Sequence, residues 1–435
     1  MKRIVVSGPS GHQRSVGVRF DESSMTNLGG LLGFKSFIDA QGLLDGVSSS
    51  RDGSRYSLRD VAENLIALRV AGIERLSHAD DLAEDPLLDA LLGERPTAST
   101  LFRRMASDGF ALSRAFATVS DRSAQVVMAE HRGRHVIALD GTSLTVFGNQ
   151  ELATRGYNLE RRGAKGYQPL IAASVTSRMV LGGVMRPGNA SAAADADGLI
   201  NDLALRLGSN VELLADAGFY GDRLLSQCEE LGWTYVVAAA GRATLVRLAQ
   251  EAAYSRVSEH VEIGEFIHQT RSMEGEVSVP RRYIVVRRSR ERRDPHQRTL
   301  VDVTPREYFF YVTNLTSSAS DVWRRYNRRS EIELVIRDLK ESFALGCLPS
   351  SSFDANAAHL QLCLAAYNSL RLYAIRVLER DLARSWGQRL RATLIRLAAR
   401  VVRGGRRILA AFAIATPLRR IVTPAFHRAA RFAPA

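Results

Sequence analysis

Apolar residues recur at helical spacing through the first 130 residues of the chain. Val61, Leu65 and Leu68 form an i, i+4, i+7 stripe behind Ser57, a residue type that caps helix N-termini, and Gly72 is placed to end this helix. Similar start and stop signals predict further helices at 85–93 and after residue 96. After a short extended start, we therefore expect a helical N-terminal domain over residues 1–130.

The pattern changes to short apolar runs after His135. Strands are predicted at 136–139, 170–175, 180–184 and 211–215, with a helix from about 192 to 207. Asp140 and Asp216 each follow one of these strands directly. Because residues at the carboxyl ends of strands in an open α/β sheet face the site crevice, the two carboxylates are expected to meet there. The fold class is α/β, with a core over residues 131–240 and 316–345.

Residues 241–315 are rich in alternating β-branched and aromatic positions, which predicts a β-rich insertion between Asp216 and Glu333. Its arginine cluster, formed by Arg281, Arg282 and the segment 287–293, could lie along a polyanion such as DNA. Beyond residue 345 the periodicity is helical again, and the segment 357–370 is apolar enough to be largely buried. Residues 346–435 are therefore expected to form a helical, Arg-rich C-terminal domain.

Four chemically distinct side chains share one predicted helical stretch. Tyr326, Arg329, Glu333 and Lys340 stand at positions 0, 3, 7 and 14, and at about 100° per residue these offsets return to one face. A carboxylate on this face could bind a hard cation while the Tyr, Arg and Lys side chains grip phosphate oxygens. The alternative is a solvated face with i, i+4 charge pairs.

The charge balance favours a polyanionic partner. The 435-residue chain has a formal net charge of +13, and the segment from Arg371 onward carries fifteen Arg against only Glu379 and Asp381. Arginine suits bidentate phosphate contacts, so nucleic acid is the leading candidate. Candidate DNA contacts beyond the helical stretch are Arg337, Arg161, Arg162, Lys165, Arg103, Arg104, Arg403, Arg406 and Arg407. Arg103 and Arg104 would serve a helix-turn-helix, for which a plain helical hairpin is an equal alternative.

Cysteine usage and hydropathy place the chain in a reducing compartment. Its three cysteines contain no C-x-x-C pair, which supports neither a disulfide framework nor a thiolate zinc site. No stretch reaches the roughly 20 apolar residues of a membrane span, and the N-terminus turns polar too early for a signal peptide. We expect a cytoplasmic, nucleoid-associated protein.

Asp140, Asp216 and Glu333 are the candidate catalytic and metal-binding residues. Phosphodiester cleavage develops charge on both the attacking and the leaving oxygen, and paired divalent ions stabilise both. Mg²⁺ prefers oxygen donors and takes one or two carboxylates per ion, so three acidic residues could hold a pair. The plain alternatives are turn-initiating roles for both aspartates and a surface role for Glu333. Without metal, mutual repulsion should raise the pKa values of the three carboxyls.

The spacing Y-x2-R-x3-E-x6-K resembles the signature of DDE-type transposases of bacterial insertion sequences, and Tyr326, Arg329, Glu333 and Lys340 match all four positions. Further stretches are similar to the 1380-type family: 18–22, 139–142, 167–170, 186–190, 215–220 and 401–407. Position 217 is Ala where that family often has Ser.

The resemblance implies an RNase H-like core and a transposase that cuts terminal inverted repeats and joins the freed 3′ ends to target DNA. It further implies Mg²⁺ or Mn²⁺ at Asp140, Asp216 and Glu333, with two ions per site, double-stranded DNA as partner, and a homodimer on paired ends. Tyr326, Arg329 and Lys340 would position phosphates. Two alternatives stay open: an inactive, transposase-derived DNA-binding repressor, and an RNase H-fold metal-dependent nuclease or junction resolvase.

Overall fold

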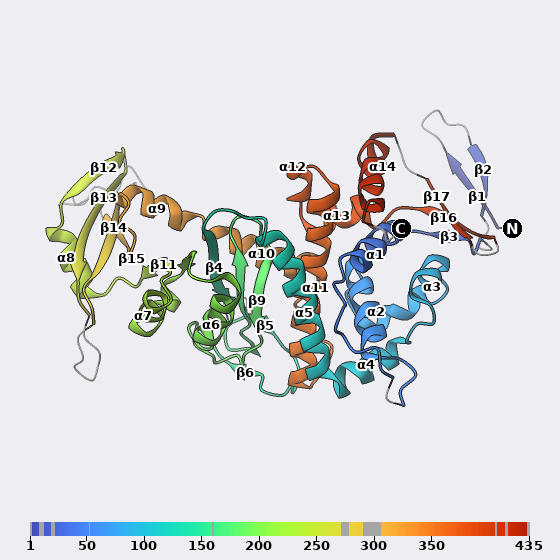
Figure 1. The fold of residues 1–435 in the computed structure, drawn as a ribbon, viewed down its shortest axis with the longest axis horizontal. Helices are drawn as coiled ribbons and strands as arrows, with labels where there is room; N and C mark the ends of the chain where they lie inside the picture. The colour runs from blue at the N-terminus through green and yellow to red at the C-terminus, as the bar shows by residue number, and fades with distance from the viewer. Residues whose placement is uncertain are drawn as a thin grey trace. The chain divides into compact units, whose positions relative to one another are not determined.

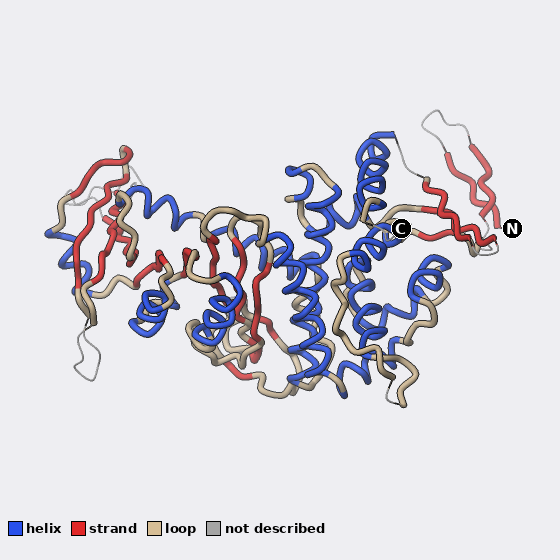
Figure 2. The backbone as a smooth tube through the Cα atoms, in the orientation of Figure 1, coloured by secondary structure: helices blue, strands red, loops and turns tan. Residues whose placement is uncertain are grey.

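The computed structural model describes residues 2–7, 13–18, 22–51, 53–158, 161–270, 278–289, 306–404, 407–413 and 416–432. Helices alternate with strands along this chain, and many of the strands form one large mixed sheet. This arrangement confirms the expected α/β class (Figures 1 and 2). The chain divides into two compact units. Unit 1 consists of Met1–Arg104 with Tyr373–Ala435, and unit 2 is Met105–Leu372. Residues 105–130, expected in the N-terminal domain, thus group with unit 2.

Unit 2 is organised around one sheet that, within the described residues, has nine strands. Its order is β12-β13-β14-β15-β11-β10-β4-β8-β9. The strands are β4 (His135–Gly141), β8 (Leu170–Ser174), β9 (Val180–Val184), β10 (Val211–Ala215), β11 (Thr234–Ala239), β12 (Tyr254–Ser258), β13 (Val261–His268), β14 (Arg281–Ser289) and β15 (Arg306–Thr313). β4, β10 and β11 run parallel, whereas β8 and β9 add an antiparallel edge beside β4.

The predicted β-rich insertion does not form a separate layer. β15 pairs antiparallel with β11, and β14, β13 and β12 follow in an antiparallel meander that extends the core sheet. Three members of the arginine cluster expected along a polyanion, Arg281, Arg282 and Arg287, instead pair with carboxylates of α7 (Asp222–Glu230) or β13. Residues 290–293 of this cluster lie outside the described residues. The insertion therefore extends the sheet that carries the candidate aspartates.

The helices of unit 2 pack on this sheet. α10 contacts β4 and β8, α5 and α6 contact β9, and α9 contacts β11, β13 and β14. Their bounds are α5 (Gly109–Met128), α6 (Ala196–Leu207), α7 (Asp222–Glu230), α8 (Ala243–Glu251), α9 (Ala319–Asn327), α10 (Ser330–Ser342) and α11 (Phe353–Val377), whose part up to Leu372 belongs to unit 2. α11 is buried along most of its length, as its apolar sequence predicts. The Asn368 side chain on α11 bonds the Val180 backbone of β9 and Ser120 of α5, so one buried amide ties three elements.

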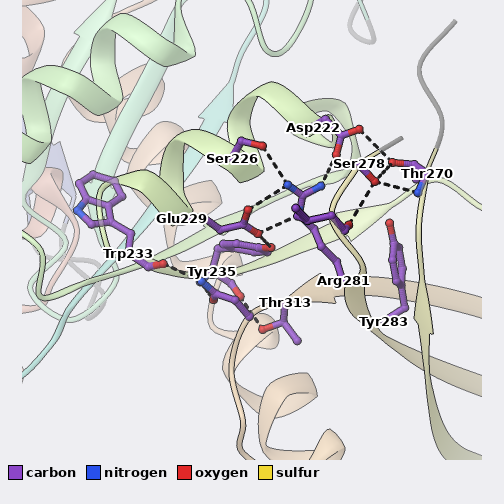
Figure 3. Close-up of polar contacts among 12 residues, drawn as sticks. Asp222, Ser226, Glu229, Trp233, Tyr235, Thr270, Ser278, Arg281, Tyr283 and Thr313 are labelled. Atoms are coloured by element: carbon purple, nitrogen blue, oxygen red, sulfur yellow. Dashed lines mark hydrogen bonds and ion pairs between the residues drawn. The ribbon is translucent and has the colours of Figure 1, made fainter. Parts of the chain in front are cut away.

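A buried ion network fastens the sheet extension to α7 (Figure 3). Arg281 at the start of β14 contacts Asp222, both carboxylate oxygens of Glu229 at 2.9 and 3.0 Å, and the Ser226 hydroxyl at 3.0 Å. The Glu229 carboxylate also accepts a bond from Tyr235 of β11 at 2.6 Å. Because the Arg281 side chain is only 5% exposed, its charge depends on these partners.

Unit 1 is mainly helical, and its best-defined helix matches the sequence signals. α2 (Leu58–Ala71) begins at Ser57 with a complete capping box to Asp60 and ends at Gly72 in the left-handed conformation. The other elements are α1 (Leu31–Ala40), α3 (Pro86–Leu92), α4 (Ala98–Ser107), α12 (Arg380–Ala383), α13 (Gly387–Leu394), α14 (Thr416–Ala430), a 3₁₀ helix at Leu76–Leu82, and the strands β1 (Lys2–Ser7), β2 (Gln13–Val18) and β3 (Met25–Thr26). Chain segments far apart in sequence meet here, since Arg391 donates to the Val70 carbonyl at 2.8 Å.

The C-terminal region is not helical throughout, and this corrects the sequence prediction. β16 (Ala399–Gly404) and β17 (Arg407–Phe412) form an antiparallel hairpin, and β16 also pairs with β3. Val401 is buried while Val402 is exposed, so the segment alternates with the period of a strand. β-branched residues beside glycines favour this hairpin over the helix that the flanking periodicity indicates.

Candidate active site

Asp140 is the penultimate residue of β4, an interior strand of the sheet. Val136–Leu139 are buried and fix the strand between β8 and β10, which leaves Asp140 at the boundary between core and solvent. Its Oδ1 accepts a bond from the Gly141 amide at 2.8 Å. Its Oδ2 faces the Arg329 guanidinium at 3.4 Å, and the side chain is 18% exposed. Asp140 is therefore both locally tethered and turned towards α10.

Asp216 follows β10 and lies beside Asp140 at the same edge of the sheet. The parallel register pairs Ala215 with Leu139, so the next residue of each strand is an aspartate. Asp216 Oδ1 accepts a bond from Gly218 at 2.9 Å and caps a short 3₁₀ helix, Ala217–Phe219. A side chain at Gly218 would lie 2.7 Å from Ala192, so this turn requires glycine. Asp216 thus has the turn role that was its plain alternative, whereas Asp140 lies within β4 and does not initiate a turn.

The signature residues do not lie on one continuous helix. α9 ends at Asn327 and α10 starts at Ser330, with Arg328 and Arg329 in a turn between them. The amide of Arg329 bonds the Tyr326 carbonyl at 2.8 Å, an i to i−3 contact that tightens the chain. Both junction residues, Arg328 and Arg329, keep helical backbone angles, and Arg329 still pairs with Glu333 at i, i+4, as a shared face predicts. Tyr326 belongs to α9, Glu333 and Lys340 belong to α10, and Arg329 stands at the junction.

The Arg329 guanidinium lies between two of the candidate carboxylates. One terminal nitrogen contacts Asp140 Oδ2 at 3.4 Å, and the other contacts Glu333 Oε1 at 2.5 Å. The Arg329 side chain is 16% exposed, whereas Glu333 is 51% exposed. Burial lowers the pKa of Arg329, but Tyr326, Asp140, Glu333 and Asp216 together raise it above its ordinary value. The acidic residues therefore surround one internal cation.

Burial is the main cause of the unusual titration of Asp140. It raises the pKa of this carboxyl to about 6, while Arg329 opposes the rise and the charges of Asp216 and Glu333 add to it. The sequence analysis expected mutual repulsion of the carboxylates as the cause, so for Asp140 the direction is right and the leading cause is wrong. Burial also raises the pKa of Tyr326, which Arg329 opposes and Asp216 reinforces.

The outer signature positions differ in their surroundings. Lys340 Nζ donates to the Ser143 carbonyl at 3.0 Å, just beyond the end of β4. Arg337 is exposed on α10. The Lys340 contact ties the C-terminal half of α10 to the segment that follows Asp140.

Arg161, Arg162 and Lys165 line a hollow of about 530 Å³ in unit 2, together with Phe147, Asn149 and Arg155. We call this the basic hollow. Its walls include a small sheet in the order β5-β7-β6, formed by β5 (Leu144–Thr145), β6 (Thr154–Arg155) and β7 (Lys165–Tyr167). The sequence analysis named three of its cations but neither Phe147 nor Arg155.

The remaining candidate DNA contacts belong to unit 1. Arg103 is exposed, whereas Arg104 donates to Ser54 Oγ at 2.9 Å and the Tyr56 carbonyl at 2.7 Å, which gives it a structural role. Arg403 donates to the Pro86 carbonyl at 2.9 Å. Arg406 lies outside the described residues. Arg407 starts β17, and its side chain is likewise outside the described part.

Sequence reasoning missed several charged residues that hold the site elements in place. Arg186, 1% exposed, donates to four backbone carbonyls, those of Gln168, Ser191, Ala192 and Ala194, and so fixes the segment that packs against Gly218. It stands in the stretch 186–190 noted above, but neither charge nor spacing indicated its role.

Two ion pairs fix the helices on either side of the Arg329 turn. Arg325 on α9 pairs at 2.7 Å with the buried Glu212 of β10, and Arg178 pairs at 2.6 Å with Glu331 of α10. Glu212 breaks the apolar run of β10, and a charge inside a buried strand was the available signal for its partner.

The donor set suits a hard divalent cation, although the carboxylates stand apart. Within the described residues, no three His, Cys, Asp or Glu side chains are grouped closely enough to hold a metal ion. The Arg329 cation stands between Asp140 and Glu333, where it takes up their charge.

Across the described helices, none is long and apolar enough to cross a membrane.

Comparison with known proteins gives a family and a distant structural likeness. The chain resembles the piggyBac transposase in a cryo-EM synaptic complex with hairpin DNA, at 12% identity and a TM-score of 0.48, over 83% of this chain and 78% of that one. No curated protein matches. The family described as "Transposase DDE domain group 1" matches residues 9–434. With a match over nearly its whole length, the chain belongs to this family of DDE transposases.

Proposed function

We propose that this transposase cuts DNA at terminal inverted repeats and joins the freed 3′ ends to target DNA, with Asp140, Asp216 and Glu333 as its catalytic carboxylates. The observation that carries the proposal is their placement. Asp140 is the penultimate residue of β4 and Asp216 directly follows the neighbouring parallel strand β10, and α10 brings Glu333 to the cation that contacts Asp140. Family membership supports the reaction class.

The core that presents these residues is proposed to be RNase H-like. Strands β9, β8, β4, β10 and β11 lie in this order, with the first three antiparallel and the last three parallel. This supports the fold that the resemblance to insertion-sequence transposases implies. We retain the 1380-type subgroup, the four predicted domain boundaries and a nucleoid-associated location in the cytoplasm as parts of the proposal.

Asp140, Asp216 and Glu333 would hold Mg²⁺ or Mn²⁺, with two ions per site. When bound, such ions stabilise charge on the attacking and leaving oxygens of a phosphodiester. The oxygen-only donors fit a hard cation, and the guanidinium already standing between Asp140 and Glu333 shows that positive charge is favoured there. Arg329 would then turn to a DNA phosphate, with Tyr326 and Lys340 as further phosphate contacts.

Double-stranded DNA is the proposed partner, with a homodimer on paired ends. Exposed arginines of the C-terminal segment, among them Arg380, Arg419 and Arg420, and the four cations of the basic hollow offer phosphate contacts in both units. These contacts would be sequence-independent, because phosphate binding sets position and base contacts set specificity.

The test uses the purified protein and a DNA fragment that contains its gene with both flanks. Glu333→Gln should abolish Mg²⁺-dependent cuts at the inverted-repeat boundaries and leave end binding intact. Glu341→Gln, the same change at an exposed position of α10, should cut like wild type. If the wild type binds the ends but does not cut them, the repressor alternative is favoured. If it cuts without preferring the ends and does not join the products, the nuclease alternative is favoured.

A further inference from the structure

The basic hollow carries more than a surface for DNA phosphates. Its described lining residues include Arg155, Arg161, Arg162 and Lys165 and no acidic residue. None of these four side chains has a carboxylate within ion-pair distance among the residues that the structure describes. Four cations around about 530 Å³ favour a ligand with at least one phosphate, and the volume is within the usual range of small-ligand sites.

An aromatic ring stands in the same hollow. Phe147 is 81% exposed, and the Arg161 guanidinium lies 5.2 Å from its ring centroid. A large apolar side chain this exposed gains nothing from the protein core. Arginine and phenylalanine together offer flat surfaces of the kind on which nucleobases stack.

The hollow is held in shape by a buried amide. Asn158, 7% exposed, donates to Thr145 Oγ1 of β5 at 2.8 Å and accepts from the Arg161 amide at 3.0 Å. The Val146 amide bonds the Lys165 carbonyl at 3.0 Å, and the Ala164 amide bonds the Arg161 carbonyl at 3.2 Å. The turn that carries the cations is therefore fixed to the strand that leads to Phe147.

The hollow is also close to the candidate active site along the chain. Phe147 stands seven positions after Asp140, and even a fully extended chain of seven steps spans at most about 25 Å. That distance is about seven base-pair steps of a duplex. A single DNA strand could therefore engage both places.

We propose that the basic hollow binds one unpaired nucleotide of a DNA strand, with the base stacked on Phe147 and its phosphates on the surrounding arginines and Lys165. A paired base has its faces covered by its neighbours, so a ring this exposed selects bases outside the helical stack. This proposal rests on the proposed function only in taking the nucleotide from a DNA strand. A free nucleotide would bind by the same chemistry, and the competition experiment below distinguishes the two ligands.

The test measures binding in EDTA, so that no cleavage contributes. Two duplexes of one sequence are compared, one fully paired and one with a single unpaired 2-aminopurine. Wild type should bind the bulged duplex more tightly and quench its fluorescence. Phe147→Ala should bind the bulged duplex about 5- to 150-fold more weakly, the usual effect of losing one stacked base. Its affinity for the paired duplex should not change.

Phe110→Ala is the matched control, because Phe110 is another exposed phenylalanine of unit 2, at 69%, that does not line the hollow. It should leave both affinities unchanged, and Phe147→Trp should retain the quenching. Replacing both Arg161 and Arg162 with Gln should make the plot of log affinity against log salt concentration less steep, by the amount expected from losing about two phosphate contacts.

Equal affinity of wild type and Phe147→Ala for the bulged duplex, or equal losses on both duplexes, would overturn the proposal. So would competition by a free mononucleotide as effective as by the bulged strand, which would assign the hollow to a soluble ligand. The proposed function fails separately, since a protein that prefers the bulge but never cuts with Mg²⁺ contradicts only the cleavage proposal.

Discussion

Replacing Asp140 with asparagine should stabilise the metal-free protein at neutral pH. The folded environment raises the pKa of this carboxyl from 3.8 to about 6, chiefly by burial, so keeping it ionised opposes folding. At 1.36 kcal/mol per pKa unit, the difference corresponds to about 3 kcal/mol. Asparagine has nearly the shape of the protonated acid and carries no charge to desolvate, so Asp140→Asn should recover most of this free energy.

The sign of the effect fixes its pH window. Because the folded-state pKa is raised, the folded protein binds the proton more tightly than the unfolded chain. The wild type therefore loses stability as the pH rises from about 4 to about 6, and the loss is complete above that. The advantage of Asp140→Asn should be near zero at pH 4 and about 3 kcal/mol at pH 8.

Thermal unfolding in EDTA at pH 4.5 and pH 8 measures this difference. For a unit of this size, about 3 kcal/mol corresponds to a rise of about 6 to 12 °C in the midpoint at pH 8. Because the chain has two compact units, hydrogen exchange of peptides from β4 should assign the change to unit 2. Asp202→Asn, the same substitution at an exposed position of α6, should change neither the unfolding midpoint nor the hydrogen exchange of β4.

The reasoning would be refuted if Asp140→Asn were less stable than wild type at pH 8, or if its advantage were the same at pH 4.5. Adding Mg²⁺ gives a second check, since a ligand that binds only the folded state stabilises it. Mg²⁺ should raise the midpoint of the wild type and leave that of Asp140→Asn unchanged. The same carboxylate would then destabilise the empty protein and hold the ion, a trade-off typical of functional residues.

Two further predictions follow from charged contacts in unit 2. Arg281→Met should cost about 1.5–3 kcal/mol, because it removes the buried cation that bonds Asp222 and Glu229 while water can still reach both carboxylates, and faster hydrogen exchange in β14 relative to β4 would show it. Arg329→Ala should weaken DNA binding but tighten Mn²⁺ binding in the absence of DNA by about 10- to 150-fold. An arginine hydrogen-bonded to carboxylates competes with the metal by about 1.5–3 kcal/mol, and electron paramagnetic resonance of Mn²⁺ would measure it.

Local signals in the sequence predict the elements of the site well. Ser57 and Gly72 mark the ends of α2 as cap chemistry requires, and the apolar runs before Asp140 and Asp216 match β4 and β10 closely. These features depend on a few neighbouring residues, which the sequence displays directly. The alternation of Val401 and Val402 is equally local, but it was overlooked within a region of helical periodicity.

The sequence could not show which strands are neighbours. Asp140 meets Asp216 because β4 and β10 pair in a register that places Leu139 opposite Ala215, although 76 positions separate the two aspartates. The extension is less predictable still. β15 joins the sheet at β11, so residues that look like an independent insertion complete the sheet of the core.

The junction between α9 and α10 shows what a spacing pattern can and cannot predict. Four residues at helical intervals indicate one face, and Arg329 does pair with Glu333 at i, i+4. The spacing does not indicate the interruption after Asn327, nor the distant partners that hold each helix, with Arg325 paired to Glu212 of β10 and Glu331 paired to Arg178. The turn places Arg329 where it can reach both Asp140 and Glu333. A spacing pattern records which side chains the chemistry needs, whereas their arrangement is set by contacts with strands more than 100 residues away.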